Sequence, residues 1–232
     1  MKVAVGLLFA DRRTGSENSA MKWTKVLPLA IAAVCGLSLA GCGSSGTGSG
    51  TSNSGSDATT VPAVNMGPAA TGTVPSWANP TYLTGTKLVT FTVGQVQVDV
   101  YQVATFTASQ DSPAVSITAG EPIVLVNYVM TNTGPAIDLD LPPEVTATYT
   151  SNPTQSMDSV LNTDLMDSAG VNQRANKDGE TGPTFAFATG DVISVGNTFP
   201  YLPGGTVTFT GNYSTGGYAD MPQATSSPVT LQ

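Results

Sequence analysis

Residues 76–232 are predicted to form an all-β fold, a sandwich of two antiparallel sheets built from seven to nine short strands. Three observations favour this class. Short apolar or alternating segments recur along the chain, clusters of Gly, Pro, Asn and Asp separate them, and only residues 156–175 interrupt the pattern. The length suits a single domain.

The first strands are predicted at 88–93 and 95–100, and the apolar phase shifts after Val100, which indicates a β-bulge. Residues 123–130 are almost continuously apolar, as expected of a central strand covered on both faces. The remaining strands are predicted at 145–149, 185–187, 192–195, 207–209 and 229–231.

The interruption divides into two parts. Met157, Val160 and Leu161 share one face at helical spacing, so 156–161 is predicted to form one or two helical turns. The Gly- and Asn-rich stretch that follows, together with its aspartates, is predicted to be a long loop.

A tether is predicted ahead of the domain, over residues 42–75. Residues 43–60 are almost entirely Gly, Ser and Thr, which leaves too little apolar surface to fold. Three prolines then stiffen residues 61–79. We expect a disordered stalk that holds the domain away from its attachment point.

Residues 21–41 have the layout of a signal peptide. Lys22 and Lys25 form a cationic lead, and 26–39 is an apolar core too short to span a bilayer comfortably. Leu39-Ala40-Gly41-Cys42 then resembles the lipobox of bacterial lipoproteins. The resemblance implies cleavage before Cys42 and diacylation of its sulfur; an ordinary secretory signal is the alternative.

Residues 1–20 do not fit that layout, because Asp11, Arg12, Arg13 and Glu17 follow a mildly apolar start. We interpret them as an upstream extension, with translation starting at Met21. The alternative is a long leader in which Arg12-Arg13 acts as a twin-arginine export signal.

The chain from Cys42 onward is strongly acidic, with three basic residues against 14 acidic ones and a net charge of −11. Phosphate binding needs clustered Lys and Arg, so nucleic acid is excluded as a partner. Adhesion to anionic lipid is disfavoured too, and the acyl anchor must hold the protein at the membrane. Cys35 lies in the signal core, so no thiol remains for disulfides in the folded domain.

The whole layout resembles surface lipoproteins of actinobacterial and other Gram-positive type, which carry a lipobox, a tether and one immunoglobulin-like domain. The matching segments are 93–98, Ala119-Gly120 and 124–132, the last ending in Thr131-Asn132. The resemblance implies an immunoglobulin-like antiparallel β-sandwich at the extracytoplasmic face of the cell membrane. It supplies no catalytic residue.

Residues for most catalytic mechanisms are absent. The sequence contains no His, which excludes Ser-His-Asp and Cys-His nucleophilic systems and histidine zinc sites. A hydrolase that uses only carboxylates is still an alternative, and Asp138 and Asp140 would face one side of an extended segment. We expect both to be solvated turn residues.

Two binding hypotheses remain. Calcium prefers oxygen ligands, and the candidate residues are Asp158, Asp164, Asp167 and Asp178. Tyr201, Tyr213 and Tyr218, with Phe199 nearby, could form an aromatic patch for a glycan or protein partner; the alternative is an aromatic cluster at the edge of the core. The sequence thus predicts a lipid-anchored, non-enzymatic binding or structural module of the cell envelope without a cofactor. A two-lobed solute-binding protein is disfavoured because alternating helices and strands are lacking.

Overall fold

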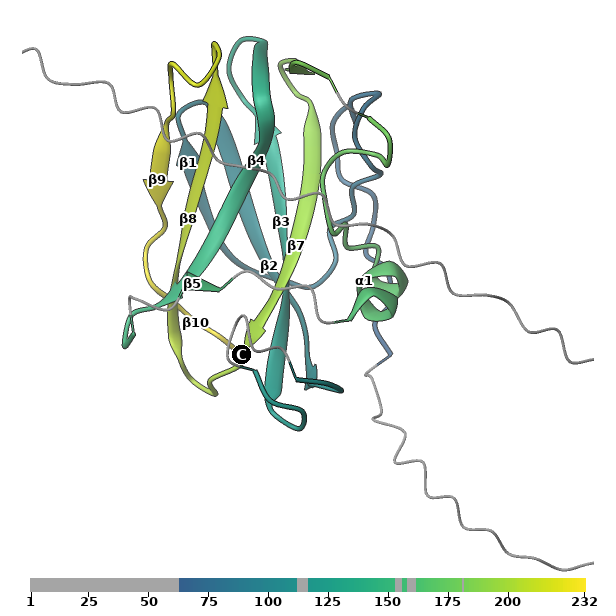
Figure 1. Cartoon of the computed structure of the whole chain (residues 1–232), viewed down its shortest axis with the longest axis vertical. Coiled ribbons are helices and arrows are strands. Elements are labelled where there is room, and N and C mark those ends of the chain that lie inside the picture. The colour runs from purple at the N-terminus through teal and green to yellow at the C-terminus, as the bar shows by residue number, and fades with distance from the viewer. Residues whose placement is uncertain (1–62, 112–116, 153–155, 158–161, 181) are drawn as a thin grey trace, which may run out of the picture. The chain divides into compact units, whose positions relative to one another are not determined.

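The computed structural model describes residues 63–111, 117–152, 156–157, 162–180 and 182–232. Two antiparallel sheets pack face to face in these residues, with one short helix at their side (Figure 1). The predicted all-β sandwich is confirmed. The lipobox, the signal peptide and residues 1–20 lie outside the described residues.

The first sheet has the strand order β1-β2-β3-β7. Its strands are β1 (Thr86–Val93), β2 (Val96–Thr107), β3 (Pro122–Asn132) and β7 (Val192–Pro200). The pairing of β2 with β3 shifts between Gln102 and Ala104, which is the bulge expected from the change of apolar phase after Val100.

Strand β3 is buried on both faces, as its continuous apolar run predicts. Val124, Val126, Tyr128 and Met130 face the main core between the sheets. The alternate residues face outward and are covered by the helix and by residues 63–85; they are Ile123, Leu125 and Val129.

The second sheet has the order β10-β8-β4-β5, with β6 paired to β4 and β9 paired to β8. Its strands are β4 (Ile137–Tyr149), β5 (Ser156–Met157), β6 (Phe185–Phe187), β8 (Thr206–Thr215), β9 (Gln223–Thr225) and β10 (Val229–Thr230). Strand β4 begins eight residues before the predicted 145–149. Residues 137–141 alternate between apolar and acidic, but the two aspartates and the following Pro142 and Pro143 suggested a turn, and the pairing with β8 is irregular there. The described strands number ten rather than seven to nine because β5 and β9 are short additions to the sheet edges.

Helix α1 (Thr163–Ala169) occupies part of the predicted long loop. The Asn162 side chain accepts a hydrogen bond from the Leu165 N–H at 2.8 Å, and Gly170 ends the helix in the left-handed conformation. The helical turn predicted at 156–161 is wrong at its start, since Ser156–Met157 is strand β5, and 158–161 lies outside the described residues.

Residues 63–75, which the sequence places in the tether, belong to the domain. Backbone hydrogen bonds join Ala70 to Thr81 at 3.0 Å and Thr73 to both Gly190 and Val192 at 3.1 and 2.8 Å. Val74 packs against the core. Small residues and prolines in this segment therefore cover the outer face of the first sheet.

Candidate binding surface

The predicted calcium residues lie on or near α1, where Asp164 and Asp167 are exposed. Asp178 is also exposed and pairs with Arg174 at 3.6 Å, and Asp158 lies outside the described residues. In the described part of the chain, no group of three or more His, Cys, Asp or Glu side chains is placed to hold a metal ion. Calcium binding stays a prediction.

Asp138 and Asp140 lie in strand β4, not in a turn, and they differ in exposure. Asp138 is exposed, whereas Asp140 is buried with 8% of its surface accessible. The pairing of β4 with β8 shifts between Leu139 and Leu141, so Asp140 lies at an irregular point of the ladder. These two carboxylates therefore do not form a pair that could act on a substrate from one side.

The Asp140 carboxylate organises the turn that follows β8. It accepts hydrogen bonds from the backbone N–H groups of Gly217 at 3.0 Å and Tyr218 at 2.8 Å. Gly216, Gly217 and Tyr218 have φ angles of 66°, 70° and 65°, and Tyr218 is the one non-glycine residue with positive φ among those described. A non-glycine residue in this conformation costs about 1–2 kcal/mol.

The three candidate tyrosines do not form one patch, because Tyr201 precedes the start of β8 and the other two lie at its end. Tyr213 is buried, and its hydroxyl lies 3.5 Å from the Gln95 backbone nitrogen. Tyr218 is 57% exposed, and Phe199 is fully buried in the core. Tyr218 is thus the tyrosine best placed to meet a partner.

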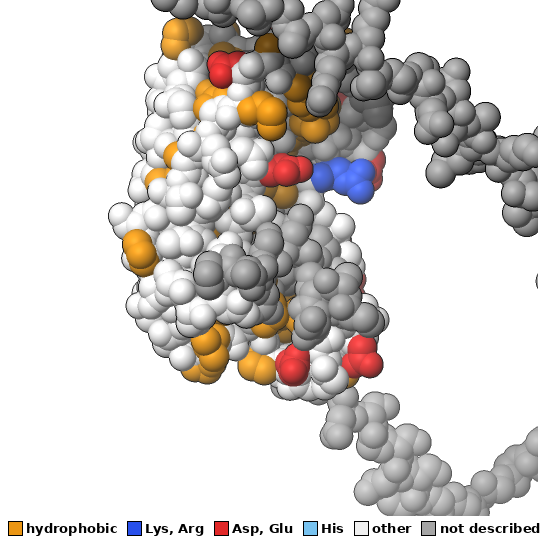
Figure 2. Space-filling view, turned by 60° about the vertical axis from the view of Figure 1, so that its left-hand side comes forward, with side chains coloured by type: hydrophobic (Ala, Val, Ile, Leu, Met, Phe, Trp, Pro, Cys, Tyr) orange, Lys and Arg blue, Asp and Glu red, His pale blue; other side chains and the backbone are white. Residues whose placement is uncertain are grey.

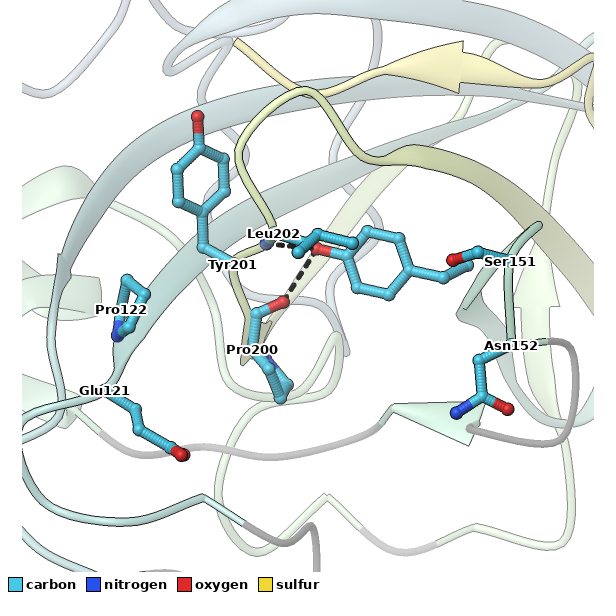
Figure 3. A pocket seen from close by; sticks show the side chains of 8 residues that line it. Glu121, Pro122, Ser151, Asn152, Pro200, Tyr201 and Leu202 are labelled. Atoms are coloured by element: carbon cyan, nitrogen blue, oxygen red, sulfur yellow. Dashed lines mark hydrogen bonds between the residues drawn. The ribbon is translucent and has the colours of Figure 1, made fainter.

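Tyr201 lies instead at a hollow of about 410 Å³ at the other end of the sandwich (Figure 3). The side chains of Glu121 and Asn152 lie on opposite sides of Pro200, and the Tyr201 ring points away from them. The Glu121 carboxylate accepts a hydrogen bond from the Thr118 N–H at 2.8 Å. Among the described residues that line this hollow, Glu121 is the one carboxylate, so these residues do not supply the acid pair that a glycoside hydrolase uses.

Tyr149 closes the floor of that hollow. Its hydroxyl donates to the Pro200 carbonyl and accepts from the Leu202 N–H, both at 2.8 Å. Burial raises the pKa of the Tyr149 phenol above its ordinary value, and the Leu202 hydrogen bond opposes that rise. The contacts fix the β7–β8 turn against β4 and account for the shape of the hollow.

A different surface surrounds Tyr218, and we name it the Leu141 patch; it comprises Leu141, Pro142, Tyr218 and Met221. These residues line one hollow of about 160 Å³. Leu141 is 49% exposed and Met221 62% exposed. Figure 2 shows hydrophobic side chains gathered at the upper end of the molecule, beside acidic and basic groups.

A second hollow of about 290 Å³ adjoins the patch, between β4 and β7. It shares Leu141, Pro142 and Glu144 with the first hollow and adds Pro143, Val195 and a loop at residues 173–176. Glu144 therefore stands between two concave surfaces. A segment of a partner protein could place apolar side chains in the two hollows and a polar group on Glu144 between them.

The hollow lies where the edge of β4 has no strand partner. Opposite β8, β4 pairs with β6 at 137–139 and with β5 at 147–148, and among the described strands none covers 140–146 on that side. Pro142 and Pro143 lack an N–H and cannot donate to an added strand. The prolines disfavour strand addition at this edge, while the Leu141 and Glu144 side chains stay accessible.

The sequence prediction did not include Leu141, Met221 and Glu144 among the candidate binding residues. The one signal was the Leu141-Pro142-Pro143 run, in which prolines interrupt a potential strand next to an apolar residue. Met221 could not be linked to it, since 80 positions separate it from Leu141.

No family model, curated protein or solved structure matches this chain. The fold and surface define its class: an acidic antiparallel β-sandwich with an exposed apolar patch. No helix among residues 63–232 that the structure describes is long and apolar enough to cross a membrane.

Proposed function

We propose that this protein is a lipid-anchored module of the cell envelope, held at the extracytoplasmic face through Cys42, whose sandwich binds a protein partner through the Leu141 patch without catalysing a reaction. The sequence supports the anchor through the cationic lead, the short apolar core and the Leu39-Ala40-Gly41-Cys42 motif. The geometry of the turn at Tyr218 supports the binding surface.

The observation that carries the proposal is that Tyr218 is exposed in a strained conformation. Glycine at this position would avoid the strain, and the tyrosine ring gains little from burial because 57% of its surface is accessible. Asp140 nevertheless holds the turn with two hydrogen bonds. Strain of this kind is concentrated at functional sites, where it presets a group for its partner.

The composition of the patch supports a protein partner. Tyr and Met are enriched in the cores of protein interfaces, and exposed apolar residues that gather in one place mark interaction sites. The connection between β8 and β9, which carries Tyr218 and Met221, lies at the upper end of the sandwich in Figure 1, whereas the described chain begins lower down, beside α1.

The binding part of the proposal is tested by capture from envelope extracts with the full chain, using one variant in the patch and one control variant away from it. Leu141→Ser/Met221→Ser removes two patch side chains. Leu202→Ser removes a side chain of equal exposure, 50%, at the other end of the sandwich. We expect the first variant to lose a protein that the native chain and the second variant retain; equal capture by all three would refute the proposal.

The anchor is tested separately by labelling cells that express the chain with a radioactive fatty acid. We expect the native protein to be labelled and to sediment with membranes, and Cys42→Ser to be unlabelled and retained as the longer precursor. Label on the Cys42→Ser variant would show that another residue carries the lipid.

A further inference from the structure

Glu144 is the charged group at the centre of the candidate surface. It is exposed and lines both hollows that flank the Leu141 patch. Its carboxylate makes no ion pair or side-chain hydrogen bond with any described residue, in contrast to Asp99, which binds Lys87 at 2.8 Å. A carboxylate that lies between two hollows and has no ion pair within the described chain can bind a cation carried by a partner.

One cation of this chain lies near Glu144, but it is paired elsewhere. Arg174 lines the larger hollow, but its recorded ion pair is with Asp178 at 3.6 Å. The chain from Cys42 onward carries a net charge of −11. An acidic partner would be repelled by this excess, and a basic partner attracted.

We propose that the partner segment seated on the Leu141 patch carries a Lys or Arg between two apolar side chains, with the cation on Glu144 and one apolar side chain in each hollow. This inference rests on the proposed function and specifies the partner's chemistry. The segment does not add a strand to β4, because Pro142 and Pro143 offer no N–H groups. Recognition is therefore by side chains.

The test uses three fluorescent twelve-residue peptides with Gly-Ser flanks and a Leu-Xaa-Leu centre, in which Xaa is Lys, Gln or Glu. The full chain is anchored in zwitterionic vesicles, and binding is followed by fluorescence anisotropy. We expect the Lys peptide to bind about fivefold more tightly than the Gln peptide, as befits a partly exposed ion pair, and the Glu peptide to bind most weakly. The preference for Lys should shrink as salt rises.

Two variants locate the effect. Glu144→Gln should make the Lys and Gln peptides bind equally, while Asp138→Asn, which removes another exposed carboxylate of β4, should keep the preference. Equal binding of the two peptides by the native protein, or a Lys preference that survives in Glu144→Gln, would overturn the charge assignment.

The outcomes separate this inference from the proposed function. Suppose that Leu141→Ser/Met221→Ser weakens the binding of all three peptides equally and that the native protein shows no preference for Lys. The patch then binds peptides, but the proposed Lys or Arg of the partner is wrong. If no peptide binds, the inference fails, and the capture experiment alone decides the proposed function. Vesicle clustering, followed by light scattering, tests two other occupants. If the protein-bearing vesicles cluster with added protein-free vesicles, the patch binds a lipid surface. If clustering needs protein on both vesicles, the patch binds a second copy of this chain, and either result overturns the inference.

Discussion

The Asp140 carboxylate accepts a 2.8 Å hydrogen bond from the Tyr218 N–H, so a residue of β4 fixes a turn 78 positions further along the chain. Asp140→Ala removes this bond and the bond from Gly217. We expect a loss of about 2–3 kcal/mol of unfolding free energy, because both bonds are to a charged group. Urea unfolding measures it; Asp138→Ala, which lies on the same strand and is exposed, should cost less than about 0.5 kcal/mol.

Tyr218→Gly separates stability from binding. Glycine relieves strain of about 1–2 kcal/mol but gives up about 0.5–1 kcal/mol through the greater freedom of the unfolded chain. We expect the variant to be about 0.5 kcal/mol more stable than the native protein in urea unfolding, and to capture less partner. A variant that is both less stable and fully competent to bind would show that the left-handed conformation does not serve the patch.

Asn132 ties three segments together at the end of β3. Its fully buried side chain donates to the carbonyls of Phe187 at 2.8 Å and Pro135 at 2.9 Å, and accepts from the Gly134 N–H at 3.0 Å. Asn132→Ala leaves these buried groups without partners, and we expect a loss of about 2–4 kcal/mol in denaturant unfolding.

Gln95 is the matched control for that change. Its side-chain amide donates to Asn132 at 3.0 Å, but the contact is only partly buried and water can replace it. Gln95→Ala should therefore cost about 1 kcal/mol or less. If both variants lost the same unfolding free energy, the role of Asn132 in joining these segments would be contradicted.

Gly196 lets the segment after α1 approach the first sheet. A Cβ at this position would lie 2.1 Å from a Val171 methyl group and 2.8 Å from the Val126 carbonyl oxygen. We expect Gly196→Ala to cost about 2–3 kcal/mol through overpacking, measured by thermal or urea unfolding. Gly190→Ala is the comparison: no atom lies within 4 Å, so only its φ of 81° opposes the change, and about 1 kcal/mol should be lost.

Alkaline pH should destabilise the fold through two tyrosines. Burial raises the pKa of Tyr149 and of Tyr101 above the ordinary value of 10.0, and Asp99 raises that of Tyr101 further. The folded state therefore keeps these protons to higher pH than the unfolded chain. This contribution to stability is complete below pH 10.0 and is lost as the pH rises above that value.

Tyr149→Phe tests the assignment. The variant loses the hydrogen bond to Pro200 and should be less stable at neutral pH, but its unfolding free energy should fall less steeply above pH 10.0 than that of the native protein. Denaturant unfolding at a series of pH values measures both effects. An unchanged alkaline slope would assign the pH dependence to other groups.

The sequence by itself determined the strand pattern, because alternation and continuous apolar runs depend only on neighbouring residues. It placed β1, β2 with its bulge, β3 and the cores of β7 and β8, and it fixed the acidity and the absence of histidine chemistry. Local periodicity failed at α1, where Asn162 and Gly170 cap a single short helix, and at residues 63–75, whose order depends on distant strands.

Only the tertiary structure brought the residues of the candidate binding surface together. Leu141 and Glu144 of β4 lie far along the chain from Tyr218 and Met221, and the two pairs meet because β4 pairs with β8 and because Asp140 holds the following turn. It also separated Tyr201 from Tyr218 by the length of β8. Spacing along a chain reports which residues share a strand, whereas the contacts between strands and the bulges that rotate side chains depend on the whole packed sandwich.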